Sequence, residues 1–162
     1  HERVVYEALK KRHRALSVQS QNLLIPETLD LSHKEADLLS SILEDLSGLG
    51  IQIEPFGGTT FVVKSIPQLM EKKQIKSLIM EIIETFLETH DPTSKEKWLE
   101  ACLISMACHT ASRANKAMQT REMVQVLEDL QRCENPFHCP HGRPTIVSLD
   151  VKQMEKLFKR VV

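Results

Sequence analysis

The sequence predicts a mixed α/β (α+β) protein with more helix than strand. Apolar residues recur three and four positions apart over long stretches, most clearly over 71–89, which is typical of amphipathic helices. Two glycines, Gly57-Gly58, separate two short apolar runs and favour a hairpin. Of the 162 residues, 41% are hydrophobic and 27% charged, a balance that excludes disorder as the main state.

The first part of the chain is predicted to hold a helix, an extended segment and a second helix. The helix covers residues 2–15 and carries an apolar stripe of Val4, Val5, Ala8 and Leu9. Residues 21–31 are expected to be extended, and Pro26 excludes this segment from the centre of a sheet because proline has no N–H. Ser32 and Glu35 form a capping box that begins the second helix.

The second helix is expected to end at Gly48 and Gly50. Two strands follow, over 51–56 and 59–66, joined at the two glycines between them. The chain then returns to helix over 71–89, where the apolar positions are Ile75, Leu78, Ile79, Ile82, Ile83, Phe86 and Leu87.

Three more helices and one more strand are predicted in the second half. Thr93 and Glu96 would form a capping box at the start of a helix that runs to about Met118, and Thr120 would cap the next helix. An irregular loop over 133–144 then leads to a short strand over 145–149. The last helix is capped by Asp150 and carries Val151, Met154, Leu157, Phe158 and Val161 in register.

Composition excludes several classes of protein. No apolar run approaches the roughly 20 residues needed to span a bilayer, so no membrane segment is expected. The net charge of −1 gives no general affinity for nucleic acid. The four cysteines form no C-x-x-C pair, which argues against a four-cysteine zinc ribbon and favours reduced thiols in the cytosol. Because His1 already lies in a predicted helix, we expect a piece of a longer protein.

The loop around Cys139 offers the richest chemistry. Cys139 and His141, with His138 as a further candidate, provide the thiolate and imidazole donors that zinc prefers. Two ligands so close together cannot complete a tetrahedron, so any metal must recruit others from distant parts of the chain. The alternative is a half-buried cysteine beside a turn histidine, and Cys108 is open to a similar alternative as a small buried residue.

The first helix offers two carboxylates, Glu2 and Glu7. Five residues correspond to about 140° around a helix, so the two do not share one face. One could bind a metal while the other supports the site or pairs with Lys11, and a solvated helix face is the alternative for both. Similarly, the clusters Lys10–Arg14 and Lys152–Arg160 could contact phosphates or simply form polar helix faces.

Four segments together resemble the C-terminal region of the mismatch repair protein MutL in its endonuclease-bearing form. Residues 1–7 (HERVVYE) match the end of the family pattern D-Q-H-A-x-x-E-x-x-x-x-E, with glutamates at Glu2 and Glu7, and 107–109 (ACH) resemble A-C-[RK]. Residues 139–144 (CPHGRP) match the family motif without change, and 158–160 (FKR) match its closing F-x-R. His109 departs from the usual basic residue, and the opening Asp and His of the first motif would precede this chain.

The resemblance implies a composite metal site. Its ligands would be Glu2, Cys108, Cys139 and His141. Glu2 would also be catalytic, and Glu7 would be a catalytic acidic partner near the site. Arg143 would have a catalytic role in orienting the phosphate or the loop, and Arg160 could do the same from the final helix. A plain packing role is the alternative for both. The implied cofactors are Zn²⁺ on the cysteine and histidine donors and Mn²⁺ or Mg²⁺ at an oxygen-rich position.

The segment Gln21–Pro26 has its own counterpart in the family. From composition alone it could be a docking peptide or a strand end closed by proline. The resemblance makes it a sliding-clamp-binding motif with Gln21, Leu24 and Pro26 as signature positions.

The resemblance also implies a two-lobed fold. Residues 1–20 and 105–162 would form a dimerisation and endonuclease lobe, and 21–104 an inserted external regulatory lobe. The expected function is a metal-dependent DNA nicking endonuclease in a homodimer, tethered by the replication clamp and acting with a MutS-type mismatch recognition protein. An ATP-binding region would lie elsewhere in the protein, and the location would be bacterial cytoplasm at the nucleoid. The alternative is a non-catalytic dimerisation and clamp-docking module with a structural zinc.

Overall fold

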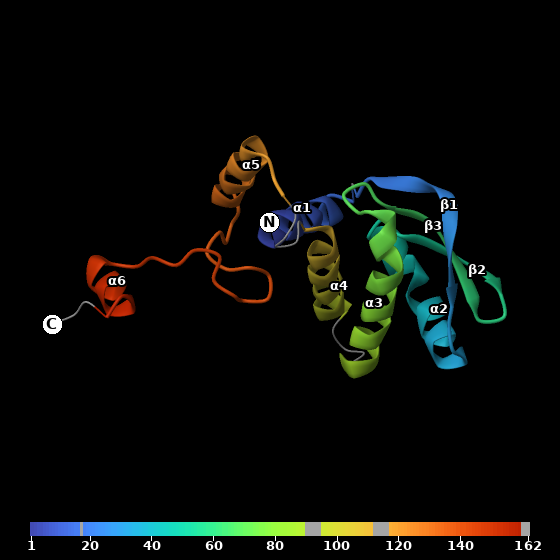
Figure 1. The fold of residues 1–162 in the computed structure, drawn as a ribbon. Coiled ribbons are helices and arrows are strands. Elements are labelled where there is room, and N and C mark those ends of the chain that lie inside the picture. Colours follow the sequence, from blue (N-terminus) through green and yellow to red (C-terminus); the bar gives the residue numbers. More distant parts are fainter. Residues whose placement is uncertain (17, 90–94, 112–116, 160–162) are drawn as a thin grey trace.

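The computed structural model describes residues 1–16, 18–89, 95–111 and 117–159. It confirms the mixed α/β class (Figure 1). The elements are α1 (Glu2–Arg14), β1 (Ser20–Asp30), α2 (His33–Gly48), β2 (Gln52–Gly57), β3 (Thr60–Pro67), the short 3₁₀ turn η1 (Lys72–Gln74), α3 (Ile75–Thr89), α4 (Lys95–Thr110), α5 (Thr120–Gln131) and α6 (Val151–Leu157). No helix of the described part is both long and apolar enough to cross a bilayer.

The sheet has three antiparallel strands in the order β1-β3-β2. The predicted hairpin is confirmed, and its two glycines both have positive φ, 136° at Gly57 and 55° at Gly58, which side chains with a Cβ rarely adopt. β1 lies at an edge, and its pairing with β3 is interrupted between Asn22 and Glu27. Pro26 lies in that interruption, as expected for a residue without an N–H to donate.

Two of the predicted helix caps are confirmed and one is wrong. The Ser32–Glu35 box is confirmed, since the Ser32 backbone N–H donates to the Glu35 carboxylate at 2.8 Å. Asp150 caps α6 as predicted, by accepting a hydrogen bond from the Gln153 N–H. The prediction of Thr120 as a cap is wrong because Gln119 takes that position and forms a box with Glu122.

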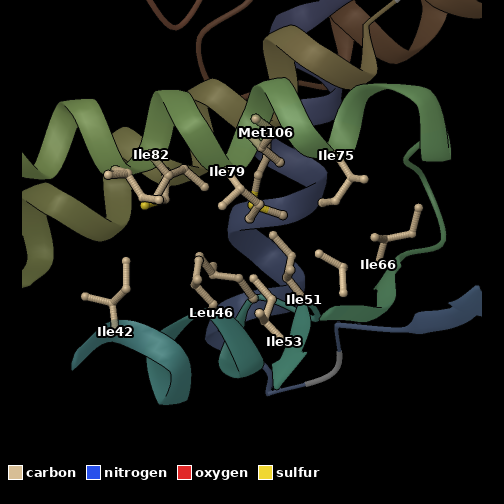
Figure 2. Packing of buried hydrophobic residues seen from close by; sticks show 14 of the residues in the cluster. Ile42, Leu46, Ile51, Ile53, Ile66, Ile75, Ile79, Ile82 and Met106 are labelled. Carbon is tan, nitrogen blue, oxygen red and sulfur yellow. The ribbon is translucent and has the colours of Figure 1, made fainter. Parts of the chain in front are cut away.

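Helices α1, α2, α3 and α4 and the sheet share one apolar core. Figure 2 shows Ile75, Ile79 and Ile82 of α3 facing Leu46, Ile51 and Ile53. The buried cluster also takes in Leu9 from α1 and Met106 from α4. The core therefore includes residues of both lobes expected from the sequence, while the boundary between those lobes stays a prediction.

The region after α4 differs most from the sequence-based expectation. α4 ends at Thr110 rather than near Met118, and Thr93 and 112–116 lie outside the described residues. The predicted strand over 145–149 is wrong for the described chain, where this segment forms no ladder. A strand needs a hydrogen-bonding neighbour, and the sequence pattern cannot supply one. Figure 1 shows the segment leading away from the core to α6.

Candidate metal centre

The predicted site depends on how α1 packs against α4. Val5, Tyr6 and Leu9 are buried on the inner face of α1. The Tyr6 hydroxyl donates to Glu100 Oε1 at 2.5 Å and accepts from Lys10 Nζ at 2.9 Å. These bonds join the middle of α1 to α4. As a result, the start of α1 lies near the end of α4, where Cys108 is located.

Three of the four predicted ligands meet in space. One ligand atom from each of Glu2, Cys108 and His141 lies within 4.8 Å of the other two. The Cys108 Sγ is 3.6 Å from His141 Nε2, and the Glu2 carboxylate is 3.6 Å from His141 Nδ1. The three residues come from three separate segments, namely α1, α4 and the loop between α5 and α6.

The donor set fits zinc. Thiolate, imidazole and carboxylate are the three zinc ligand types of proteins. With Zn–S near 2.3 Å and Zn–N near 2.0–2.1 Å, two ligands on one tetrahedral ion stand about 3.5 Å apart. The Cys108 sulfur is 3.8 Å from His141 Nδ1, the ring nitrogen that also lies 3.6 Å from the Glu2 carboxylate, and both distances are close to that value. The three side chains are thus spaced to share one ion after small rotations.

The protonation of Cys108 bears on metal binding. Burial is the main cause that raises the pKa of its thiol to about 11, and the negative charges of Glu2 and Glu81 add to it. Arg143 acts in the opposite direction. In the metal-free protein the thiol is therefore protonated near neutral pH, and a cation must displace that proton to bind.

Cys139 lies beside this cluster but not within it. Its backbone N–H donates to the Arg143 carbonyl at 2.8 Å, and its carbonyl accepts from Gly142 N–H at 2.9 Å. Its thiol is close enough to contribute to the raised pKa of Cys108. The structure therefore places the fourth predicted ligand in the neighbourhood of the other three without joining it to them.

The two other predicted catalytic residues have different surroundings. Arg143 is exposed, and its guanidinium acts electrostatically on Cys108. Glu7 is tied to the loop rather than to the cluster, since it accepts hydrogen bonds from the backbone N–H groups of Glu134 and Asn135. Its ion pair is with Arg3, at 3.6 Å, rather than with Lys11 as considered from sequence. Arg160 lies outside the described residues.

One polar group near the site was missed by sequence reasoning. Glu81 on α3 accepts from Ser105 Oγ at 2.6 Å and lies 2.8 Å from His109 Nε2. Burial tends to raise the pKa of the Glu81 carboxyl, but the hydrogen bonds from Ser105 and His109 lower it overall. Glu81 is one of three glutamates on the amphipathic helix α3, so the sequence does not single it out, and its partners are remote in the chain.

The predicted clamp motif protrudes from the edge of the sheet. Leu24 is 99% exposed and Ile25 is 67% exposed within the interruption of β1. The Gln21 side chain donates to the Met70 carbonyl at 3.1 Å. Lys72 donates to the Ile25 carbonyl at 2.7 Å, so the turn after β3 contacts both Gln21 and Ile25.

The fold brings together a cluster of side chains of metal-ligand type and exposes a segment at a sheet edge, and comparison with known proteins gives the family of the chain. The family described as "MutL C terminal dimerisation domain" matches residues 1–118. The chain belongs to this family, as the sequence motifs indicated.

Relatives from several bacteria carry the name DNA mismatch repair protein MutL. The chain is 38% identical to that of Azorhizobium caulinodans over 160 residues, 37% identical to that of Shouchella clausii over 161 and 36% identical to that of Ligilactobacillus salivarius over 160. Each alignment covers 99% of this chain but only 24–26% of the relative. The chain thus spans about a quarter of the length of these relatives.

Proposed function

We propose that the chain is the endonuclease and homodimerisation region of a MutL-type mismatch repair protein, which hydrolyses a DNA phosphodiester and leaves a nick. The observation that carries this proposal is the meeting of Glu2, Cys108 and His141 at one point. Sulfur, nitrogen and carboxylate donors from three distant segments together make a ligand set that one divalent cation could share.

The residues of the candidate site would have two kinds of role, metal ligand and phosphate-orienting group. Cys108, His141 and Glu2 would hold Zn²⁺, with Cys139 adjacent to complete the set. Mn²⁺ or Mg²⁺ would use carboxylate oxygens, to which Glu2 contributes. Such ions polarise a phosphoryl oxygen and lower the pKa of an attacking water. Arg143 is exposed beside Cys108 and would orient a DNA phosphate through its planar guanidinium.

Partners would compensate for weak intrinsic affinity for DNA. With a net charge of −1 the chain has no large electrostatic attraction to a polyanion. The exposed Gln21–Pro26 segment would attach it to the replication clamp, which raises the effective concentration at DNA. A MutS-type mismatch recognition protein would supply the signal, in the bacterial cytoplasm.

The last two helices support the homodimer. α5 exposes Met123, Val124 and Leu127, each by about half or more. α6 exposes Val151, Met154 and Leu157, and Phe158, which follows the helix, is exposed as well. These side chains form the apolar faces of amphipathic helices, yet in a single chain they face solvent. Burial against a second copy would remove that apolar area from water.

A second candidate function is a non-catalytic dimerisation and clamp-docking module with a structural metal. The observation that favours it is the closeness of Cys139 to Cys108, because a fourth protein ligand would leave no open position for a water.

Nicking of supercoiled plasmid in the presence of Mn²⁺ distinguishes the endonuclease from the non-catalytic module. The assay uses the full-length protein with and without clamp, and compares wild type with Glu2→Gln, Cys108→Ala and the surface control Glu128→Gln. The endonuclease proposal predicts that the first two variants remain folded and dimeric but lose nicking, while the control retains it. Nicking that survives both site substitutions would contradict it, and unfolding of both would favour the structural role.

A further inference from the structure

The loop that carries His141 has a defined internal shape. Cys139 N–H donates to the Arg143 carbonyl at 2.8 Å, and Thr145 N–H donates to the Phe137 carbonyl at 2.9 Å. Gly142 has a φ of +82°, which closes the tight turn. These bonds fix the loop's own conformation but do not determine where it lies relative to α1 and α4.

Two side chains of α1 bond to the backbone of this loop. Arg3 Nε donates to the His138 carbonyl at 2.7 Å, and Arg3 Nη2 donates to the Cys139 carbonyl at 3.0 Å. One guanidinium therefore holds two successive carbonyls of the loop, an arrangement that suits its planar fork of donors. Glu7 accepts from the backbone N–H groups of Glu134 at 2.7 Å and of Asn135 at 3.2 Å.

Arg3 and Glu7 also constrain one another. Their ion pair measures 3.6 Å, and only 11% of the Arg3 side chain and 18% of the Glu7 side chain are exposed. The Arg3 guanidinium lies 5.3 Å from the centre of the Tyr6 ring, within the range of a cation–π contact. Tyr6 in turn bonds Glu100 on α4. A continuous set of contacts thus joins α1, α4 and the loop, the same three segments that provide Glu2, Cys108 and His141.

We propose that Arg3 and Glu7 are positioning residues that hold the loop so that His141 faces Glu2 and Cys108. This role replaces the catalytic role expected for Glu7, because both of its carboxylate oxygens already accept backbone N–H groups 2.7–3.2 Å away. The expected effect on metal binding rests on the proposed metal-dependent function, whereas the contacts between α1 and the loop do not depend on that function.

The most informative substitutions keep size and change hydrogen bonding. Glu7→Gln replaces one acceptor oxygen by an NH₂ group, which then faces a backbone N–H without an acceptor. Arg3→Lys keeps the charge but loses the fork that holds two carbonyls. The exposed pair Arg132 and Glu128 on α5 provides matched controls, Arg132→Lys and Glu128→Gln, since it is also an ion pair four residues apart.

Two measurements on the full-length protein test the proposal. Hydrogen exchange of the metal-free protein follows the amides of Glu134, Asn135 and Cys139. Titration with Co²⁺ gives the dissociation constant and, at saturation, the intensity of the thiolate-to-cobalt absorption band. Outer residues that orient metal ligands change affinity by about 10–100-fold, so each variant is expected to weaken Co²⁺ binding by about tenfold or more.

The expected result is faster exchange in the loop and weaker Co²⁺ binding in Glu7→Gln and Arg3→Lys, with the saturated band retained and both controls unchanged. Retained intensity would show that the ligands are intact and only their positioning has suffered. Unchanged exchange and affinity would overturn the proposal, as would an altered saturated spectrum in Glu7→Gln, which would make Glu7 a ligand. If wild type binds no Co²⁺, the metal function fails and hydrogen exchange alone decides the positioning role.

Discussion

The Cys108 sulfur lies 3.6 Å from the Nε2 atom of His141, although 33 positions separate the two residues in the chain. Neither residue is brought there by local structure. Cys108 is near the end of α4, which packs on α1, and His141 is on a loop that α1 holds through Arg3. The candidate metal centre therefore depends on the tertiary packing of α1 more than on any one motif.

Removing the Tyr6 hydroxyl should weaken the packing of α1 on α4. Tyr6→Phe deletes a hydrogen bond to Glu100 and leaves Lys10 without one of its acceptors. The free energy of unfolding is expected to fall by about 1–2 kcal/mol, measured by urea denaturation. Stability equal to wild type would show that these bonds do not hold α1 in place.

The stability contributed by Glu100 should depend on pH. Its pKa is lowered by the hydrogen bonds from Tyr6 and then from Lys10. In the unfolded chain the carboxyl has a pKa of about 4.3, so it takes up a proton at a higher pH than the folded carboxyl does. The stabilisation is therefore fully present above about pH 4.3 and is lost as the pH falls through the pKa of the folded protein. In urea unfolding across this range, the difference between wild type and Glu100→Gln should shrink toward acid. A difference that stays constant would contradict a lowered pKa of Glu100 in the folded protein.

Leu24 should contribute directly to clamp binding. It is 99% exposed in this chain, so its substitution leaves the core unchanged while removing an apolar contact with the partner. Leu24→Ala in the full-length protein is expected to weaken binding to the replication clamp by about tenfold or more, measured by surface plasmon resonance. Leu16→Ala is the matched control, because Leu16 is 91% exposed and lies outside the segment. Equal losses in both variants would refute a specific role.

Charges placed on α5 and α6 should weaken self-association. Leu127 is 60% exposed and Leu157 is 69% exposed, each on an apolar helix face. Leu127→Glu and Leu157→Glu would bury a carboxylate in the proposed homodimer interface, which is costly. Sedimentation velocity should show a shift toward monomer, with Leu16→Glu unaffected. Dimers that persist in both variants would place the interface elsewhere.

Local sequence signals predicted the fold where the structure is itself local. The Ser32–Glu35 box and the Gly57-Gly58 turn each act over a few residues, and both were confirmed. The strand over 145–149 failed because its existence requires a neighbour that no local pattern specifies.

The candidate site shows the same division. The resemblance to the family implied Glu2, Cys108, Cys139 and His141 as metal ligands, and the structure groups three of them, without Cys139. The role of Arg3 and the Glu81–His109 pair could not be predicted, since each is defined by a partner far away in the chain.

X-ray absorption at the zinc edge of the zinc-loaded full-length protein tests the central claim most directly. If Cys108, His141 and Glu2 share one ion, the spectrum should contain sulfur at about 2.3 Å together with nitrogen or oxygen at about 2.0–2.1 Å. The sulfur contribution should fall in Cys108→Ser and stay unchanged in Cys133→Ser. A zinc environment without sulfur, or one that Cys108→Ser does not alter, would contradict the claim.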